Sequence, residues 1–199
     1  MSLRPELQKI CDWIEPGSRV LDLGCGDGAL LEWLQQQRDI KGYGLEIDTA
    51  NVQQCLTKRV NIIQSDIDAG LKEFDDGSFD VVIMTQALQV LQHPDQTLAE
   101  MARVGRKSIV TFPNFGLWKH RFYLMTKGRM PVSKALPAEW YDTQNIHLCT
   151  VKDFESFCRE HTLDISKRDF VDYAHQSDGL MRFWPNLFAE VALYEINGR

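Results

Sequence analysis

The sequence predicts an α/β fold, in which a mostly parallel sheet of about seven strands carries helices on both faces. Two observations lead to this prediction. Short apolar segments alternate with amphipathic ones as far as Phe112, and this βαβ order is typical of a parallel sheet. The chain has 199 residues, 44% of them apolar and 25% charged, which is the size and composition of a single globular domain.

The elements are expected in a regular order along the chain. An amphipathic helix is expected over residues 3–14, where apolar side chains recur at helical spacing before Pro16 and Gly17 break the pattern. A strand buried on both faces is expected over 79–84, where the densest apolar run of the chain, Val81 to Met84, lies. The other strands expected up to residue 112 cover 19–23, 42–46, 60–64 and 107–112, with helices over 28–37, 49–58 and 96–104.

The last third of the chain does not keep this alternation. Residues 113–150 contain prolines, glycine or asparagine breakers and many aromatics without a clear period, so we expect a lid-like insertion that holds short helices. A helix is expected over 152–161, and the strands expected over 163–173 and 190–196 would form an antiparallel edge pair. The predicted single domain, 1–199, thus consists of a core (1–115), the insertion (113–150) and a C-terminal helix with two strands (151–199).

Charge and cysteine content narrow the classes of function. The chain has 22 Lys and Arg against 28 Asp and Glu, and this net charge of −6 disfavours nucleic acid and anionic membranes as main partners. No segment approaches the roughly 20 apolar residues of a membrane span, and the first residues lack the apolar core of a secretion signal. A cytoplasmic protein is therefore expected. Five cysteines without a C-x-x-C pair indicate reduced thiols, and no metal site is expected.

The clearest candidate site is a glycine-rich turn after the first strand. The apolar residues 20–23 lead into Gly24, Gly26 and Gly28, and a helix is expected to follow. Glycine permits positive φ and close approach of a ligand, and the start of a helix offers unbonded N–H groups. Because ligands bind at the carboxyl ends of strands in an open parallel sheet, this turn is expected to hold a ligand.

Two classes of ligand fit the turn. The pattern Gly24-x-Gly26-x-x-Ala29, followed by Glu46, matches the dinucleotide fingerprint of oxidoreductases. Asp22, at the end of the first strand, would repel a pyrophosphate but attract an ammonium group. For charges about 4 Å apart at an effective dielectric constant of about 20, either interaction is roughly 4 kcal/mol. The sequence therefore favours a ligand with an α-amino group, and a dinucleotide remains the alternative.

Two further carboxylates follow the second and third strands. Glu46 is placed to accept hydrogen bonds from both hydroxyls of a ribose, and Asp66 can accept one from an exocyclic adenine amine. Together with Asp22 they would bind the ammonium, ribose and adenine groups of one ligand. S-adenosylmethionine and its product S-adenosylhomocysteine carry all three groups. The expected cofactor-binding residues are Asp22, Gly24, Cys25, Gly26, Glu46, Ile47, Asp66, Ile67 and Gln86.

The glycine turn, Glu46 and Asp66 resemble the successive motifs of class I S-adenosylmethionine-dependent methyltransferases. Further stretches are similar to the bacterial methionine biosynthesis protein MetW family, namely 75–82, 86–89 and above all 110–116, with Trp118, Arg121 and Pro131. The resemblance implies a Rossmann-like class I methyltransferase fold and a role in methionine biosynthesis. It also implies that the chain associates with homoserine O-acyltransferase and supports the activity of that enzyme.

Methyl transfer to a small-molecule acceptor is the alternative function. The transfer is a displacement at a sulfonium methyl that positioning can largely support, so the lack of an evident base does not exclude it. Residues 84–87 do not match the Asn/Asp-Pro-Pro-aromatic tetrad of enzymes that methylate amino groups of bases or glutamine, which disfavours that substrate class. No catalytic residue is assigned. The candidates for the substrate side are His120, Tyr123, Tyr141 and His147.

Overall fold

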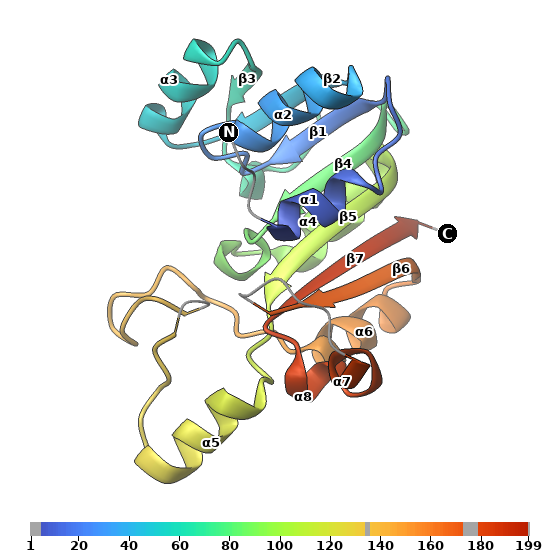
Figure 1. Ribbon diagram of the computed structural model, residues 1–199. Helices are drawn as coiled ribbons and strands as arrows, with labels where there is room; N and C mark the ends of the chain where they lie inside the picture. The colour runs from blue at the N-terminus through green and yellow to red at the C-terminus, as the bar shows by residue number, and fades with distance from the viewer. Residues whose placement is uncertain (1–4, 134–135, 173–178, 199) are drawn as a thin grey trace.

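One mixed sheet organises the chain. The computed structural model describes residues 5–133, 136–172 and 179–198, and within these ranges seven strands follow the order β3-β2-β1-β4-β5-β7-β6 (Figure 1). The strands are β1 (Arg19–Leu23), β2 (Lys41–Glu46), β3 (Asn61–Gln64), β4 (Phe79–Thr85), β5 (Gly105–Pro113), β6 (Leu163–Val171) and β7 (Val191–Gly198). The predicted fold class is confirmed.

The direction of β7 distinguishes it from the other strands. Parallel pairing joins β3, β2, β1, β4 and β5, whereas β7 lies between β5 and β6 and is antiparallel to both. The expected antiparallel pair is therefore present, but of its two strands only β6 is an edge strand of the sheet. A register shift between Ile165 and Lys167 and the charged run Lys167 to Asp169 protect this edge from pairing with another chain.

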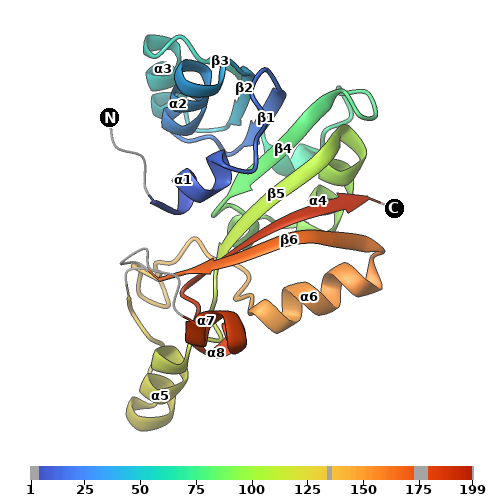
Figure 2. The same ribbon diagram turned by 45° about the vertical axis from the view of Figure 1, so that its right-hand side comes forward.

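Helices cover both faces of the sheet. One layer contains α1 (Pro5–Cys11), α2 (Ala29–Arg38) and α3 (Thr49–Thr57), and the other contains α4 (Pro94–Val104) and α6 (Val151–Glu160) (Figures 1 and 2). Alternate residues of β4 pack against the two layers. Val81 and Ile83 pack in the first layer, and Val82 and Met84 pack in the second. This double burial explains why residues 81–84 of β4 are all apolar.

Some boundaries differ from the expected ones. The first helix ends at Cys11 rather than at residue 14, and the expected residues 3 and 4 lie outside the described residues. The helix expected over 96–104 begins earlier, at Pro94, because proline at the first helical position lacks only an N–H that would be unbonded there. The strand expected to reach residue 173 ends at Val171, and residue 173 is outside the described ranges.

The insertion carries one regular helix in its described part. This helix, α5 (Trp118–Lys127), stands away from the sheet beyond the end of β5 (Figure 2). Two short helices, α7 (Gly179–Phe183) and α8 (Pro185–Phe188), precede β7 at the same end of the molecule. Among the described helices, none has the length and apolar character required to cross a membrane.

Candidate functional site

The glycine turn lies where several strand ends converge. The N–H groups of Gly24 and Cys25 donate to the carbonyl oxygen of Leu45 on β2, at 2.9 and 3.1 Å. A Cβ at Gly24 would lie 3.4 Å from Ala87 Cβ, after β4, and 3.5 Å from Ile67 Cδ1, after β3. Gly24 therefore brings the turn into contact with the loops that follow both of these strands.

All three glycines of the turn adopt a conformation that favours glycine. Gly24, Gly26 and Gly28 have φ of 69°, 56° and 75°. At Gly28 a Cβ would lie only 2.8 Å from Cys55 Sγ, so this glycine is also required by packing. At Gly26 a Cβ would meet no described atom within 4 Å, which leaves the backbone accessible to a ligand.

Asp22 lies buried beneath this turn, with 1% of its surface exposed. Its Oδ1 atom has no hydrogen-bond partner among the described residues. Burial, and to a smaller degree the negative charge of Glu46, raises the pKa of Asp22 to about 8. A buried carboxyl oxygen with unused acceptor capacity fits a cationic donor such as an ammonium group, which would favour the ionised form.

Glu46 is fixed by backbone hydrogen bonds at the carboxyl end of β2. Its Oε1 accepts from the N–H groups of Ile47 and Asp48, both at 2.9 Å, and its Oε2 accepts from Gly26 at 2.8 Å. The last bond ties the glycine turn to β2. Because a carboxylate oxygen has about two acceptor sites, Oε2 keeps one for a ligand hydroxyl.

Asp68, which was not predicted from the sequence, joins the loop after β3 to the loop after β4. Asp66 is exposed and caps the short 3₁₀ helix η1 (Ile67–Ala69) by accepting from the Asp68 N–H at 3.0 Å. The carboxylate of Asp68 in turn accepts from the N–H groups of Gln92 and His93, at 3.0 and 3.2 Å. No local motif distinguishes Asp68 from a solvated loop carboxylate, because its partners lie 24 and 25 residues away.

The end of β4 holds two amides with unused groups. Gln86 has a φ of 52°, and its N–H donates to Thr111 O at 2.9 Å. Gln89, in the 3₁₀ helix η2 (Leu88–Val90), donates from Nε2 to Gln86 O at 2.7 Å. Gln86 Nε2 and Gln89 Oε1 are buried and have no partner in the described part of the chain. Gln86 was predicted for this site, whereas Gln89 was not.

The two cysteines near the turn lie behind it. Cys25 Sγ and Cys55 Sγ are 3.9 Å apart, and Cys55 Sγ donates to Gly26 O at 3.3 Å. A Cβ at Gly44 would lie 2.5 Å from Cys25 Sγ, so the Cys25 side chain occupies the space that this glycine leaves. Burial raises the pKa of both thiols. The side chain of Cys25 therefore packs behind the turn, and its contact with a ligand stays a prediction.

The four substrate-side candidates lie in different surroundings. His120 is buried, with Nε2 3.2 Å from Ser133 Oγ, and desolvation lowers its pKa. Tyr123 and Tyr141 are exposed. His147 lines a cavity of about 350 Å³ beneath η2, together with Gln89, and its N–H donates to Gln89 O at 3.0 Å. The substrate-side roles of all four remain predictions.

Among the described residues, no group of three or more His, Cys, Asp or Glu could hold a metal ion.

Comparison with known proteins identifies relatives over nearly the whole chain. The family model of methionine biosynthesis protein MetW matches residues 4–196. A bifunctional methionine biosynthesis protein MetXA/MetW of Rhodopirellula baltica is 31% identical over 181 residues, which are 86% of this chain and 29% of the relative. The chain thus spans less than a third of the length of that relative.

Solved structures of low sequence identity share the fold. An S-adenosylmethionine-dependent methyltransferase from Archaeoglobus fulgidus is 15% identical with a TM-score of 0.71, and the match covers 97% of this chain and 91% of that one. The [4+2]-cyclase SpnF is 17% identical with a TM-score of 0.66, covering 98% and 81%. The fold alone therefore does not assign a reaction. The chain belongs to the methionine biosynthesis protein MetW family and has the Rossmann-like fold of class I S-adenosylmethionine-dependent methyltransferases.

Proposed function

We propose that the chain binds S-adenosylmethionine, or S-adenosylhomocysteine, at the carboxyl ends of β1, β2 and β3. The observation that carries this proposal is the buried, unpartnered Oδ1 of Asp22 beside the glycine turn, which suits the α-amino group of the ligand. Oε2 of Glu46 would accept from a ribose hydroxyl, and the exposed Asp66 from the adenine amine. The fold shared with S-adenosylmethionine-dependent methyltransferases supports the same ligand.

The partner in this proposal is homoserine O-acyltransferase. Binding of S-adenosylmethionine to the chain would couple this enzyme to the supply of S-adenosylmethionine. The name of the Rhodopirellula relative joins MetXA and MetW in one chain, and we assign its MetXA portion to the acyltransferase. A ligand shifts such a pairing only when it binds the coupled and uncoupled states with different affinity. S-adenosylmethionine derives from the end product of the pathway, so its binding gives feedback a physical basis.

Calorimetric titration tests this role directly. The purified chain is titrated with homoserine O-acyltransferase of the same organism, without and with saturating S-adenosylmethionine. We expect the two affinities to differ by roughly 5- to 150-fold, the usual range for a coupling between sites. The variant Glu46→Ala, with weakened ligand binding, should show a smaller difference at the same ligand concentration. Equal affinities for the wild-type chain would contradict the sensing role.

Methyl transfer to a small molecule is the second candidate function. It is favoured by the unpartnered Gln86 Nε2 and Gln89 Oε1, which could orient an acceptor at the end of β4. When bound, S-adenosylmethionine supplies an electrophilic methyl group, so the chain would have only to position the acceptor and exclude water. Incubation with labelled S-adenosylmethionine and a metabolite extract should give a labelled product that Glu46→Ala reduces. No product, with the cofactor shown to be bound, would contradict this function.

A further inference from the structure

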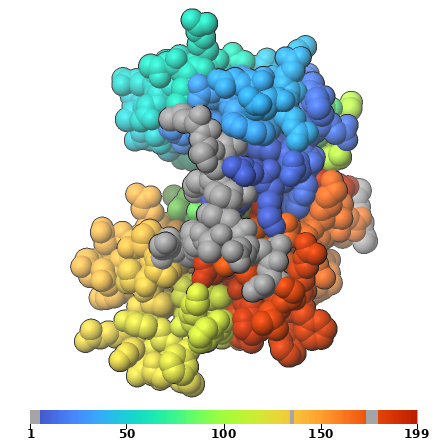
Figure 3. Space-filling model, viewed as in Figure 1, coloured from blue at the N-terminus to red at the C-terminus, as the bar shows by residue number. Residues whose placement is uncertain are grey.

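The end of the molecule beyond β5 exposes a group of large apolar side chains. We call this group the apolar platform and define it by six residues of α5 and the α7–α8 segment: Trp118, Phe122, Met125, Leu180, Phe183 and Trp184. Phe122, Met125 and Phe183 are 56%, 75% and 73% exposed. Figure 3 shows α5 and the α7–α8 segment together at this end of the molecule. Exposed apolar groups of this kind mark interaction surfaces.

The helix α5 contributes an apolar face without a partner in the described chain. Trp118, Phe122 and Met125 follow the spacing i, i+4, i+7, which places them on one face of the helix. All three are exposed, and His120 is the only buried residue of α5. A surface helix normally turns such a face toward the core, and a helix of ten residues gains most of its stability from that packing. The face of α5 is therefore suited to another molecule.

The platform is held in place by hydrogen bonds, of which those of Asn114 are buried. Asn114, which is fully buried after β5, donates from Nδ2 to Ala189 O at 2.8 Å and accepts at Oδ1 from Gly116 N–H at 3.0 Å. Arg121 on α5 donates to Gly116 O at 2.5 Å and to Asn186 O at 3.3 Å. These bonds join α5 to the α7–α8 segment. A surface that is already ordered loses less entropy when it binds a partner.

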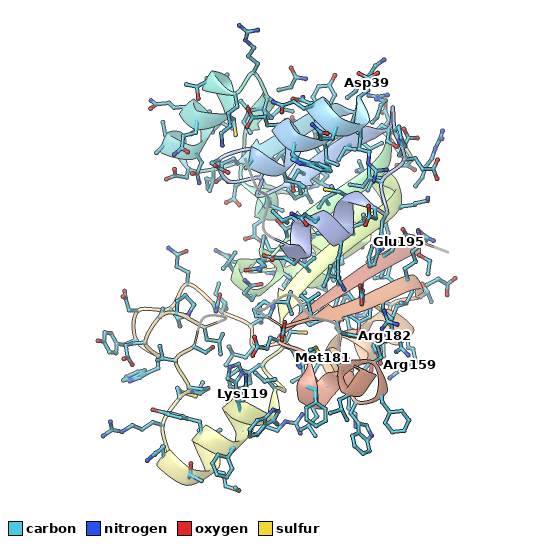
Figure 4. The ribbon with its side chains drawn as sticks, in the orientation of Figure 1. Asp39, Lys119, Arg159, Met181, Arg182 and Glu195 are labelled. Atoms are coloured by element: carbon cyan, nitrogen blue, oxygen red, sulfur yellow. The ribbon has the colours of Figure 1, made fainter. Side chains whose placement is uncertain are left out.

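The charge around the platform indicates what the partner presents. Residues 118–132 contain Lys119, Arg121, Lys127 and Arg129 and no Asp or Glu, although the whole chain has a net charge of −6. Lys119 also pairs with Glu190 at 3.0 Å. Figure 4 shows Lys119 on α5 and Arg182 on α7 at this end of the molecule. An apolar centre with a basic rim complements an apolar area with an acidic rim on another protein.

We propose that the apolar platform is the docking surface for homoserine O-acyltransferase, through an apolar area of that enzyme bordered by acidic side chains. This inference rests on the proposed function and adds the place where the partner binds. The choice of occupant follows from the Rhodopirellula relative, in which the part that matches this chain makes up 29% of a protein that also carries MetXA. A domain that shares a chain with the acyltransferase stays close to it, at a high effective concentration. Contact between the two through a docking surface is then favoured.

The test uses exposed residues whose replacement leaves the core intact. Phe122→Ser and Phe183→Ser are compared with Leu56→Ser, a matched control on α3 whose leucine is also exposed. We expect each platform variant to weaken acyltransferase binding by at least about tenfold in calorimetry, as loss of a central aromatic contact does. Leu56→Ser should bind as the wild type does. All three variants should keep the S-adenosylmethionine affinity and the thermal midpoint of the wild type.

Three results would overturn the inference. If the wild-type chain binds the acyltransferase and both platform variants bind it equally well, the docking surface is elsewhere and the proposed function stands. If the wild-type chain does not bind the acyltransferase at all, the proposed partnership and the docking surface both fail. If the platform variants instead abolish self-association, or binding to vesicles of phosphatidylcholine and phosphatidylglycerol, while acyltransferase binding is unchanged, the platform serves a second copy or a membrane.

Discussion

Asp22 combines burial with an unused acceptor, and this combination is costly unless a ligand is bound. Its carboxyl lies beneath the glycine turn beside Glu46, and both burial and that neighbouring charge oppose its ionisation. Sequence reasoning identified Asp22 and Glu46 because both occupy fixed positions at strand ends. It missed Asp68, which accepts from Gln92 24 residues away, and Gln89, whose carbonyl accepts from the distant His147, since these contacts are set by how the loops meet rather than by spacing along the chain.

Replacing Asp22 with asparagine tests its titration in the ligand-free chain. The pKa of Asp22 is about 8 in the folded chain and 3.8 when unperturbed, so between these pH values the folded state holds a proton that the unfolded state has released. Stability therefore falls as pH rises from about 4 to about 8. Because the side-chain amide introduced by Asp22→Asn cannot ionise, the variant should gain stability relative to the wild type over this window, by up to about 1.4 kcal/mol per pH unit.

Urea unfolding at three pH values across this window, about 5, 6.5 and 8, each without ligand, measures the difference. Asp75→Asn, at an exposed position, is the control for the general effect of removing a carboxyl group. A constant difference in unfolding free energy between Asp22→Asn and the wild type would show that Asp22 is ionised throughout the window.

Whole elements were predicted where burial determines the pattern of apolar residues in the sequence. The strand β4 is buried on both faces, and its continuous apolar run made it recognisable. The helix α5 has apolar residues that face no core, so it could be expected only as part of an insertion. The place of β7 between β5 and β6 depends on tertiary pairing, which local sequence does not encode.

Gly116 tests how the insertion is attached to the sheet. A Cβ at this position would lie 2.9 Å from Asn114 Oδ1, 2.9 Å from Asn186 O and 3.1 Å from Arg121 Nη2. The backbone carbonyl cannot move without shifting α8, so Gly116→Ala should destabilise the chain by about 1 to 3 kcal/mol in urea unfolding. Gly179→Ala, where a Cβ would meet no described atom within 4 Å, is the matched control and should be nearly neutral. Equal stability of the two variants would contradict this attachment.

At the scale of the whole molecule, the proposed cofactor site and the apolar platform are connected through β5. Thr111 on β5 accepts from the N–H of Gln86, at the end of β4. Three residues later, Asn114 accepts from Gly116, which precedes α5, and donates to Ala189, which follows α8. Both features therefore lie at the carboxyl edge of the sheet. This arrangement provides a route by which ligand binding could alter the docking surface, and the calorimetric coupling described above measures whether it does.

The central claim is that the turn binds S-adenosylmethionine rather than a dinucleotide. Calorimetric titration of the purified chain, freed of copurified ligand as verified by mass spectrometry, compares S-adenosylmethionine with NAD. We predict saturable binding of one S-adenosylmethionine per chain, weakened roughly 5- to 150-fold in Glu46→Ala through loss of a charge-assisted hydrogen bond of about 1 to 3 kcal/mol. NAD should not bind comparably. Saturable binding of NAD without binding of S-adenosylmethionine would contradict the account.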